Sequence, residues 1–260
     1  MIKILKYCFA DLMRSRWSYI YLVFYLILGF VLLFLNSDIS KAIITLMNII
    51  VVLTPMIGTI FGVMYFYNSR EFTELLLAQP VKRSRIFLGQ YLGISLSLVF
   101  SLIVGLGVPF LVYGLFQSAE IINFVMLLLS GTLLTFIFVA LAINVALFNT
   151  NKIKGFGYTI LIWLFFSVIY DGLFMISLVF YDEYPLDTFA LVATVFNPID
   201  LSRIMILLNL DISALLGYTG ALFQNFFGTS LGLIASIGAL LLWVAIPISL
   251  MLWQSSKKDF

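Results

Sequence analysis

Six long apolar stretches divide this chain, and they restrict its fold more than any other feature. Because the hydrocarbon core of a bilayer is about 30 Å thick, a helix that crosses it needs about 20 consecutive apolar residues. Stretches of that length lie at about residues 17–36, 43–67, 91–117, 121–148, 156–181 and 229–253. The sequence therefore predicts an all-α integral membrane protein with six transmembrane helices, in which residues 1–260 form a single domain.

The composition points to the same class. Hydrophobic residues make up 63% of the chain, whereas soluble domains contain about 45–50%. The chain has no His and a single Cys, Cys8, which removes the commonest metal ligand and any disulfide within the chain. Its nine Met residues suit Cu(I), but no Cys or His lies near them and Met is common apolar filler. We expect no metal site, and nothing favours binding of nucleic acid.

Lys and Arg residues are distributed unequally between the two ends of these spans. Of the 14 in the chain, only Lys41 and Arg203 fall on one side, while the other twelve precede the first span, follow the last, or lie between spans 2 and 3 or spans 4 and 5. Basic connections stay in the cytoplasm. The distribution therefore predicts an even number of spans, with both termini in the cytoplasm.

The sequence predicts that residues 1–16 form an amphipathic helix in the cytoplasmic interface of the membrane. Its apolar positions recur at helical spacing and its basic ones face elsewhere. The apolar positions are Ile2, Leu5, Phe9 and Leu12. An ordinary basic flank of the first span is an equally good interpretation.

The connection between spans 2 and 3, residues 69–90, is charged and contains a proline. Residues 71–79 predict a short amphipathic helix, which Pro80 ends because proline restricts the preceding residue and cannot continue the hydrogen bonding. We expect Phe72, Leu75 and Leu76 on one side, and Glu71, Glu74 and Ala78 on the other. Lys82, Arg83 and Arg85 then meet anionic headgroups. An ordinary basic loop is the alternative.

Asp171 is the one acid expected deep within a span, where an ionised carboxylate costs on the order of 2.5–3.5 kcal/mol. Two interpretations stay open. Either Asp171 lines or gates a polar path, in a groove or at a subunit seam, or it is a structural group bonded to hydroxyls such as those of Ser167 and Tyr170.

Residues 182–228 form the only long connection, and we expect them on the outer side. Asn197, Pro198 and Asp200 together mark a helix start. Apolar residues then repeat on one face, at Leu201, Ile204, Met205 and Leu208. A second helix is expected from Asp211 or Ser213. Both are too short to span, so they should lie on the outer leaflet or dip into it.

No run matches the Gly-x-x-x-x-Gly-Lys-Ser/Thr loop that cradles ATP phosphates. If ATP drives this protein, another chain must bind it. The lack of His also excludes Ser–His proteases and the zinc-protease helix motif. We therefore do not expect an enzyme.

Two runs resemble the permeases of type-2 ATP-binding-cassette (ABC-2) transporters: Leu-Ala-Gln-Pro-Val-Lys-Arg-Ser-Arg at 77–85 and Leu-Gly-Gln-Tyr-Leu-Gly at 88–93. The resemblance extends over the whole chain. It implies an N-terminal elbow helix, a cytoplasmic coupling helix between spans 2 and 3, and outer helices between spans 5 and 6. It also implies a homodimer in the bacterial inner membrane, bound to ATPase subunits that hold ATP and Mg²⁺, so that this chain needs no cofactor. The implied ATPase-coupling residues are Glu71, Phe72, Glu74, Leu75, Leu76, Pro80, Lys82, Arg83 and Arg85.

Within that family, the outer runs at 197–203 (Asn-Pro-Ile-Asp-Leu-Ser-Arg) and 216–221 (Leu-Gly-Tyr-Thr-Gly-Ala) resemble the permeases that serve maturation of nitrous oxide reductase. This resemblance implies a periplasmic copper chaperone on the outer helices and a role in assembling the copper centre of the reductase. The implied contact residues are Asn197, Asp200, Arg203, Asp211 and Tyr218. An ABC-2 exporter of a lipid, drug or glycan is the alternative, and an ATP-independent carrier or membrane enzyme is a third hypothesis.

Overall fold

The computed structural model describes residues 1–36, 38–180, 187–209 and 230–257, and within these ranges every regular element is a helix. This confirms the all-α class for the described part of the chain. The elements are α1 (Ile2–Arg14), α2 (Arg16–Leu35), α3 (Ile39–Asn68), α4 (Arg70–Leu77), α5 (Arg83–Val112), the short 3₁₀ turn η1 (Leu115–Gln117), α6 (Ile121–Phe148), α7 (Lys152–Leu164), the π-turn η2 (Phe165–Ile169), α8 (Tyr170–Phe180), α9 (Asp187–Val195), α10 (Pro198–Asn209) and α12 (Ser230–Lys257).

Six helical segments are long and apolar enough to cross a membrane, which confirms a multi-pass membrane protein. They are Arg16–Leu35, Ile39–Asn68, Arg83–Val112, Ile121–Phe148, Lys152–Ser177 and Gly232–Ser256. The third differs most from its expected bounds, 91–117. It ends early because Gly114 adopts a left-handed backbone conformation, with φ of 84°, which breaks an α-helix and which glycine tolerates best.

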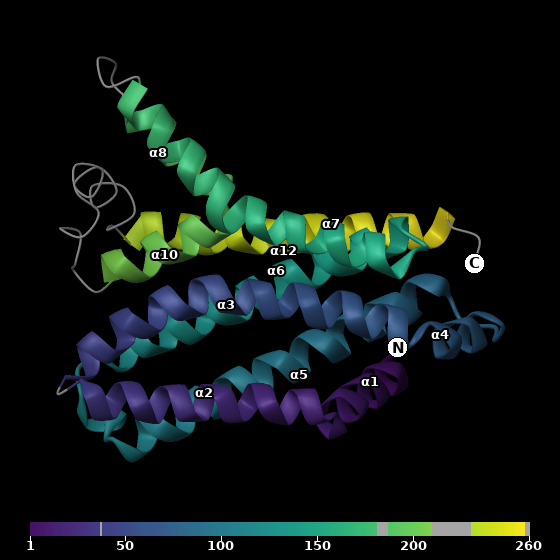
Figure 1. Cartoon of the computed structure of the whole chain (residues 1–260), viewed down its shortest axis with the longest axis horizontal. Helices are drawn as coiled ribbons and strands as arrows, with labels where there is room; N and C mark the ends of the chain where they lie inside the picture. Colours follow the sequence, from purple (N-terminus) through teal and green to yellow (C-terminus); the bar gives the residue numbers. More distant parts are fainter. Residues whose placement is uncertain (37, 181–186, 210–229, 258–260) are drawn as a thin grey trace.

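The centre of the bundle is formed by α3 and α6, which pack closely along their lengths (Figure 1). Glycines of α3 make this approach possible, since a Cβ atom added at Gly62 would lie 2.9 Å from the Cβ of Ala142. On one side of this pair lie α2, α5 and α1, and on the other α7, α10 and α12. The span that contains η2 is the least buried, at 11% of its window, because its outer part, α8, leans away from the bundle (Figure 1).

The helix α1 is present where the sequence predicts an amphipathic helix, but its buried stripe differs. Cys8 and Leu12 are its buried residues, whereas Ile2 is 69% exposed. The stripe packs on α5 at a glycine, because a Cβ atom at Gly93 would lie 2.6 Å from the Cβ of Cys8. Close backbone approach, rather than apolar periodicity alone, therefore decides which face of α1 is covered.

The start of α1, the end of α12 and α4 lie at one end of the bundle (Figure 1). We call this the α4 end, and the other the outer end. Besides the six spans, α9 and α10 form a pair bent by 111° that together is also long and apolar enough to cross. The structure thus contains six or seven candidate spans.

The helix α10 begins at Pro198, as the sequence predicts, and it dips into the bundle beside α6, α3 and α12. Three residues of the expected apolar face, Leu201, Ile204 and Met205, are buried, and the side chain of the fourth, Leu208, lies outside the described part. Ile206 and Leu207, which lie off that face, are buried as well. Being enclosed by several helices, α10 is buried around most of its circumference rather than along one stripe.

Candidate functional site

The helix α4 lies beyond the ends of α3 and α5, outside the apolar bundle (Figure 1). It spans Arg70–Leu77, close to the predicted 71–79, and the chain turns at Pro80 as expected. The exposed ion pair Arg70–Glu74, 2.9 Å long at i, i+4, adds little stability because both groups are solvated. The position of α4 is therefore held mainly by its contacts with the bundle.

Two contacts attach the inner face of α4 to different helices. Thr73 is buried, and its hydroxyl accepts a 2.7 Å hydrogen bond from the side-chain amide of Gln90 on α5. The ring of Phe72 stacks on that of Tyr7 of α1, with centroids 4.6 Å apart. The same Thr73 hydroxyl donates to the carbonyl of Ser69 at the end of α3. A displacement of α4 would thus be felt by α5, α1 and α3 together.

The predicted arrangement of side chains on α4 is wrong for Leu75. We expected it beside Phe72 and Leu76, but Leu75 is 69% exposed while those two are partly buried. At 100° per residue, the buried side is centred near Thr73 and Leu76, and Leu75 points well away from it. The outward face of α4 consists of Glu71, Glu74, Leu75 and Ala78.

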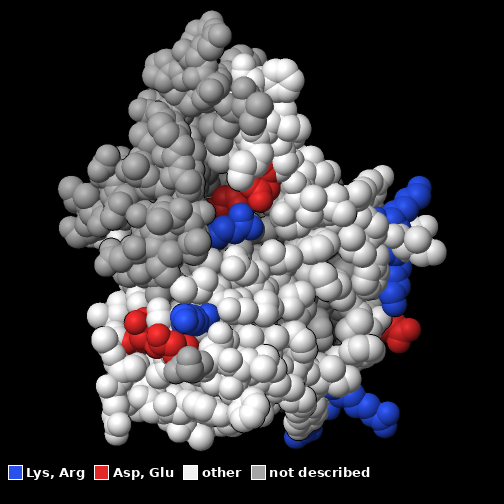
Figure 2. Space-filling view, turned by 60° about the vertical axis from the view of Figure 1, so that its left-hand side comes forward, with Lys and Arg blue, Asp and Glu red and all other residues white. Residues whose placement is uncertain are grey.

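The predicted basic cluster follows α4 directly. Lys82, Arg83 and Arg85 are all exposed. They lie at the N-terminus of α5, which is at the α4 end of the bundle. Figure 2 is turned so that the outer end comes forward. Most of its blue side chains lie along the right-hand and lower edges of the molecule, away from the outer end. The structure therefore gathers the basic residues at one end of the bundle, as the charge distribution predicts.

Asp171 forms part of a charged cluster at the outer end. Arg203 Nη1 lies 3.4 Å from Asp171 Oδ2 and 3.2 Å from Asp200 Oδ1. The cluster therefore joins the start of α8 to α10. Figure 2 shows basic and acidic side chains in contact on this end. Two carboxylates share one guanidinium, whose charge offsets part of the cost of taking them out of water.

The alternative in which hydroxyls satisfy Asp171 is wrong. Tyr170 donates instead to the carbonyl of Ala193, at 2.6 Å, and the buried Ser167 hydroxyl has no hydrogen-bond partner among the described residues. The π-turn at Phe165–Ile169 is the physical reason. It inserts an extra residue into the turn, so Ser167 no longer lies one α-helical turn below Asp171.

Asn197, at the bend between α9 and α10, is fully buried. Its carbonyl oxygen accepts from the backbone N–H of Ile199 at 3.0 Å, which caps α10, and its amide donates to the carbonyl of Phe166 at 2.9 Å. Trp243 donates to the carbonyl of Val195 at 3.0 Å. Such bonds satisfy the backbone at a helix break in an apolar environment.

The expected outer contact residues are therefore in different situations. Asn197 and Asp200 are buried and bonded within the chain, and Arg203 is engaged by both carboxylates. Asp211 and Tyr218 lie outside the described residues, as does the expected second outer helix. That these residues contact an outer partner stays a prediction.

Sequence reasoning missed Gln90, Thr73 and Tyr7, which position α4. For Gln90, a sequence signal was available: it is a polar residue within an apolar run, and a buried amide needs a hydrogen-bond partner. Among the described residues, no three His, Cys, Asp or Glu side chains are grouped to hold a metal ion. A scan against protein-family models and a search of curated proteins found no match to this chain.

Proposed function

We propose that this protein is the membrane-spanning permease subunit of an ABC-2 transporter in the bacterial inner membrane, and that α4 is its coupling helix. The observation that carries the proposal is α4 itself. It is a short helix outside the apolar bundle, tied on its inner side to α5 and α1, and no described helix covers its outer face. A membrane subunit driven by a cytoplasmic motor needs such an element.

The outer face of α4 has the chemistry of a docking helix. Leu75, 69% exposed, is the apolar anchor that fills a groove on the ATPase, since Phe72 and Leu76 are partly buried against the bundle. Glu71 and Glu74 flank it and set register and encounter rate more than affinity. Helix-in-groove recognition works through such an apolar anchor on one helix face.

Force would pass from the ATPase to the spans through the inner face of α4. The Thr73–Gln90 hydrogen bond carries displacement to α5, and the Phe72–Tyr7 stack carries it to α1. Because α1 is itself packed on Gly93 of α5, these two helices should move together. ATP and Mg²⁺ would bind on the partner subunit, since this chain has no phosphate-binding loop.

The finer proposal is a permease similar to NosY, acting as a homodimer with an ATPase similar to NosF and a periplasmic copper chaperone similar to NosD. It rests on the outer runs at 197–203 and 216–221. In that role the chain converts ATP hydrolysis inside into transport or conformational signalling outside, for assembly of the nitrous oxide reductase copper centre. An ABC-2 exporter of a lipid, drug or glycan is the alternative.

Purification of the tagged chain from its native membrane, followed by mass spectrometry of the bound subunits, tests both levels. An ABC ATPase in stoichiometric amount supports the permease assignment. An additional periplasmic β-helical protein supports the maturation role, whereas an ATPase without it favours the exporter. Recovery of the folded chain with no ATPase contradicts the proposal.

A further inference from the structure

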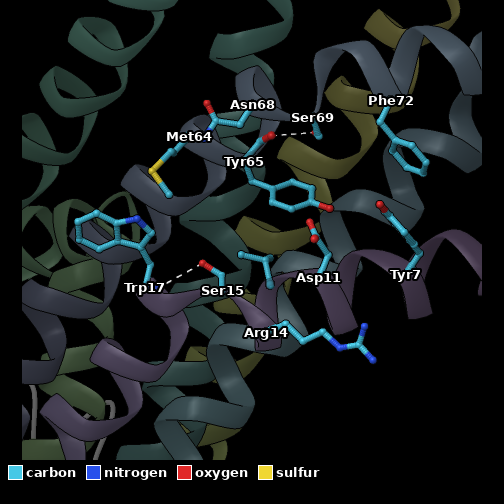
Figure 3. A pocket seen from close by; sticks show the side chains of 11 residues that line it. Tyr7, Asp11, Arg14, Ser15, Trp17, Met64, Tyr65, Asn68, Ser69 and Phe72 are labelled. Atoms are coloured by element: carbon cyan, nitrogen blue, oxygen red, sulfur yellow. Dashed lines mark hydrogen bonds between the residues drawn. The ribbon is translucent and has the colours of Figure 1, made fainter.

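A pocket of about 460 Å³ opens at the α4 end, where α1, the start of α2, the end of α3 and α4 meet (Figure 3). Its lining combines aromatic rings with one carboxylate and one guanidinium. These residues are Tyr7, Asp11, Arg14, Trp17, Tyr65 and Phe72. The proposed function uses only the Phe72–Tyr7 contact at its edge.

The hydroxyl of Tyr65 is the group in this pocket that most clearly indicates a ligand. Tyr65 is 7% exposed, and its hydroxyl makes no hydrogen bond of good geometry within the described part of the chain, although the Cys8 thiol and the Asp11 carboxylate lie beside it. A buried hydroxyl without a partner is unfavourable. Figure 3 shows it pointing from α3 toward the carboxylate of Asp11 on α1. The Tyr65 hydroxyl and the Asp11 carboxylate thus lie side by side on the wall of the pocket.

Asp11 gives that space its charge. It is exposed and makes no ion pair with any residue that the structure describes. The hydroxyl of Tyr7 lies near the same space (Figure 3), and its ring is fixed by stacking on Phe72. A carboxylate beside aromatic rings attracts an organic cation. A primary ammonium has three donors, which match the oxygens of Asp11, Tyr65 and Tyr7.

The surroundings indicate that the cation belongs to a lipid. Arg14, one helical turn beyond Asp11, lines the same pocket; its guanidinium is turned away from Asp11 in Figure 3, and rotation of its side chain would bring it to a phosphate. Trp17 begins the first span and is 58% exposed, as is common at the membrane interface. Next to it, the outer face of α2 is apolar, with Ile20 and Phe24 exposed, and can accompany acyl chains.

We propose that this pocket binds the headgroup of phosphatidylethanolamine, with its ammonium between Asp11 and Tyr65 and its phosphate beside Arg14. The site joins α1 to α3 next to α4. It does not depend on the presence of an ATPase, so its test is separate from that of the proposed function.

The test is lipid binding to the full-length protein, measured by native mass spectrometry during titration with short-chain phosphatidylethanolamine, phosphatidylcholine or phosphatidylglycerol. Choline lacks the N–H donors, and glycerol lacks the cation. We expect the ethanolamine lipid to bind about tenfold more tightly than either of the other two lipids. Neither phosphatidylcholine nor phosphatidylglycerol can donate the ammonium hydrogen bonds to the Asp11 carboxylate.

The variants Tyr65→Phe and Asp11→Asn should each remove this preference. The matched controls Tyr19→Phe, on the exposed face of α2, and Asp38→Asn, at the outer end, should keep it. Tyr65→Phe deletes a hydroxyl that makes no hydrogen bond of good geometry within the described residues, so its melting temperature in lipid-free detergent should stay close to that of the unmodified chain. This variant therefore decides the question even if Asp11→Asn fails to fold.

Three results would overturn the proposal. The first is equal binding of all three lipids by the unmodified protein. The second is an undiminished ethanolamine preference in Tyr65→Phe. The third is displacement of the lipid by an equal concentration of soluble glycerophosphoethanolamine. That result would mean that the ligand is a water-soluble phosphate ester of ethanolamine rather than a membrane lipid.

Discussion

The side-chain amide of Gln90 donates a 2.7 Å hydrogen bond to the hydroxyl of Thr73, and both residues are buried. The bond fastens α4 to α5. Thr73→Val should lower the free energy of unfolding by about 1–2 kcal/mol, because it leaves the buried Gln90 amide unsatisfied. Gln90→Met should cost less, about 0.5–1 kcal/mol, because the Thr73 hydroxyl still donates to the Ser69 carbonyl. Chemical unfolding in detergent measures both values.

The double variant separates this contact from general damage. A coupling free energy of about 1 kcal/mol between positions 73 and 90 is expected from the double-mutant cycle. Ser101→Ala is the control on α5, because among the described residues the Ser101 hydroxyl bonds only to the Ser97 carbonyl of its own helix. Strict additivity of the two changes at positions 73 and 90 would mean that α4 is not held by this bond.

The glycines of α5 allow a matched comparison within one helix. A Cβ atom at Gly93 would lie 2.6 Å from the Cβ of Cys8, whereas one at Gly107 would meet nothing within 4 Å. Gly93→Ala should therefore destabilise the protein by about 1–3 kcal/mol through overpacking. Gly107→Ala should be neutral or stabilising by up to about 1 kcal/mol, since Ala favours the helix. Equal melting temperatures for the two variants would contradict the close packing of α1 on α5.

The cluster of Asp171, Arg203 and Asp200 predicts an order of effects. Arg203→Gln leaves two neighbouring carboxylates without a counter-ion and should cost about 2–3 kcal/mol. Asp171→Asn leaves Arg203 paired with Asp200, 3.2 Å away, and should cost about 1 kcal/mol or less. Adding Asp171→Asn to Arg203→Gln should restore part of the stability, because it removes one of the repelling charges. Thermal unfolding measures all three, and the reverse order would contradict the cluster.

Two exposed alanines at opposite ends of the bundle, Ala78 and Ala119, test the orientation. A cysteine at Ala119 should react with an impermeant maleimide on intact cells, and one at Ala78 should react only after lysis. The native thiol does not interfere. Cys8 is 0% exposed, and burial raises the pKa of its thiol, so less reactive thiolate forms at a given pH. Labelling of Ala78→Cys from outside would reverse the topology.

Much of the fold follows from short-range properties of the sequence. Length and apolarity define the six spans, and Pro80 and Pro198 mark the end of α4 and the start of α10, because a proline acts on its own neighbours. The side of α4 that carries Leu75 was not predictable in this way. On an eight-residue helix, the buried face depends on where α1 and α5 lie.

The contacts that complete the candidate sites join residues distant in sequence. Asp171 meets Arg203 32 residues later, and the shift in register at η2 that directs Asp171 there has no signal in the apolar pattern. The pocket between Asp11 and Tyr65 likewise requires α1 to lie across the end of α3. Such pairings depend on helix packing, which residue periodicity does not specify.

The most direct test of the account is the affinity of the ATPase for permeases altered on the outward face of α4. Leu75→Ser removes the proposed anchor, while Ile153→Ser, on the exposed first turn of α7 at the same end of the bundle, is the matched control. Loss of an anchor costs about 2 kcal/mol, so Leu75→Ser should weaken binding of the ATPase by roughly thirtyfold and leave the melting temperature unchanged, with Ile153→Ser at the unmodified affinity. Undiminished ATPase binding and coupled activity in the folded Leu75→Ser permease would contradict the assignment of α4 as the coupling helix.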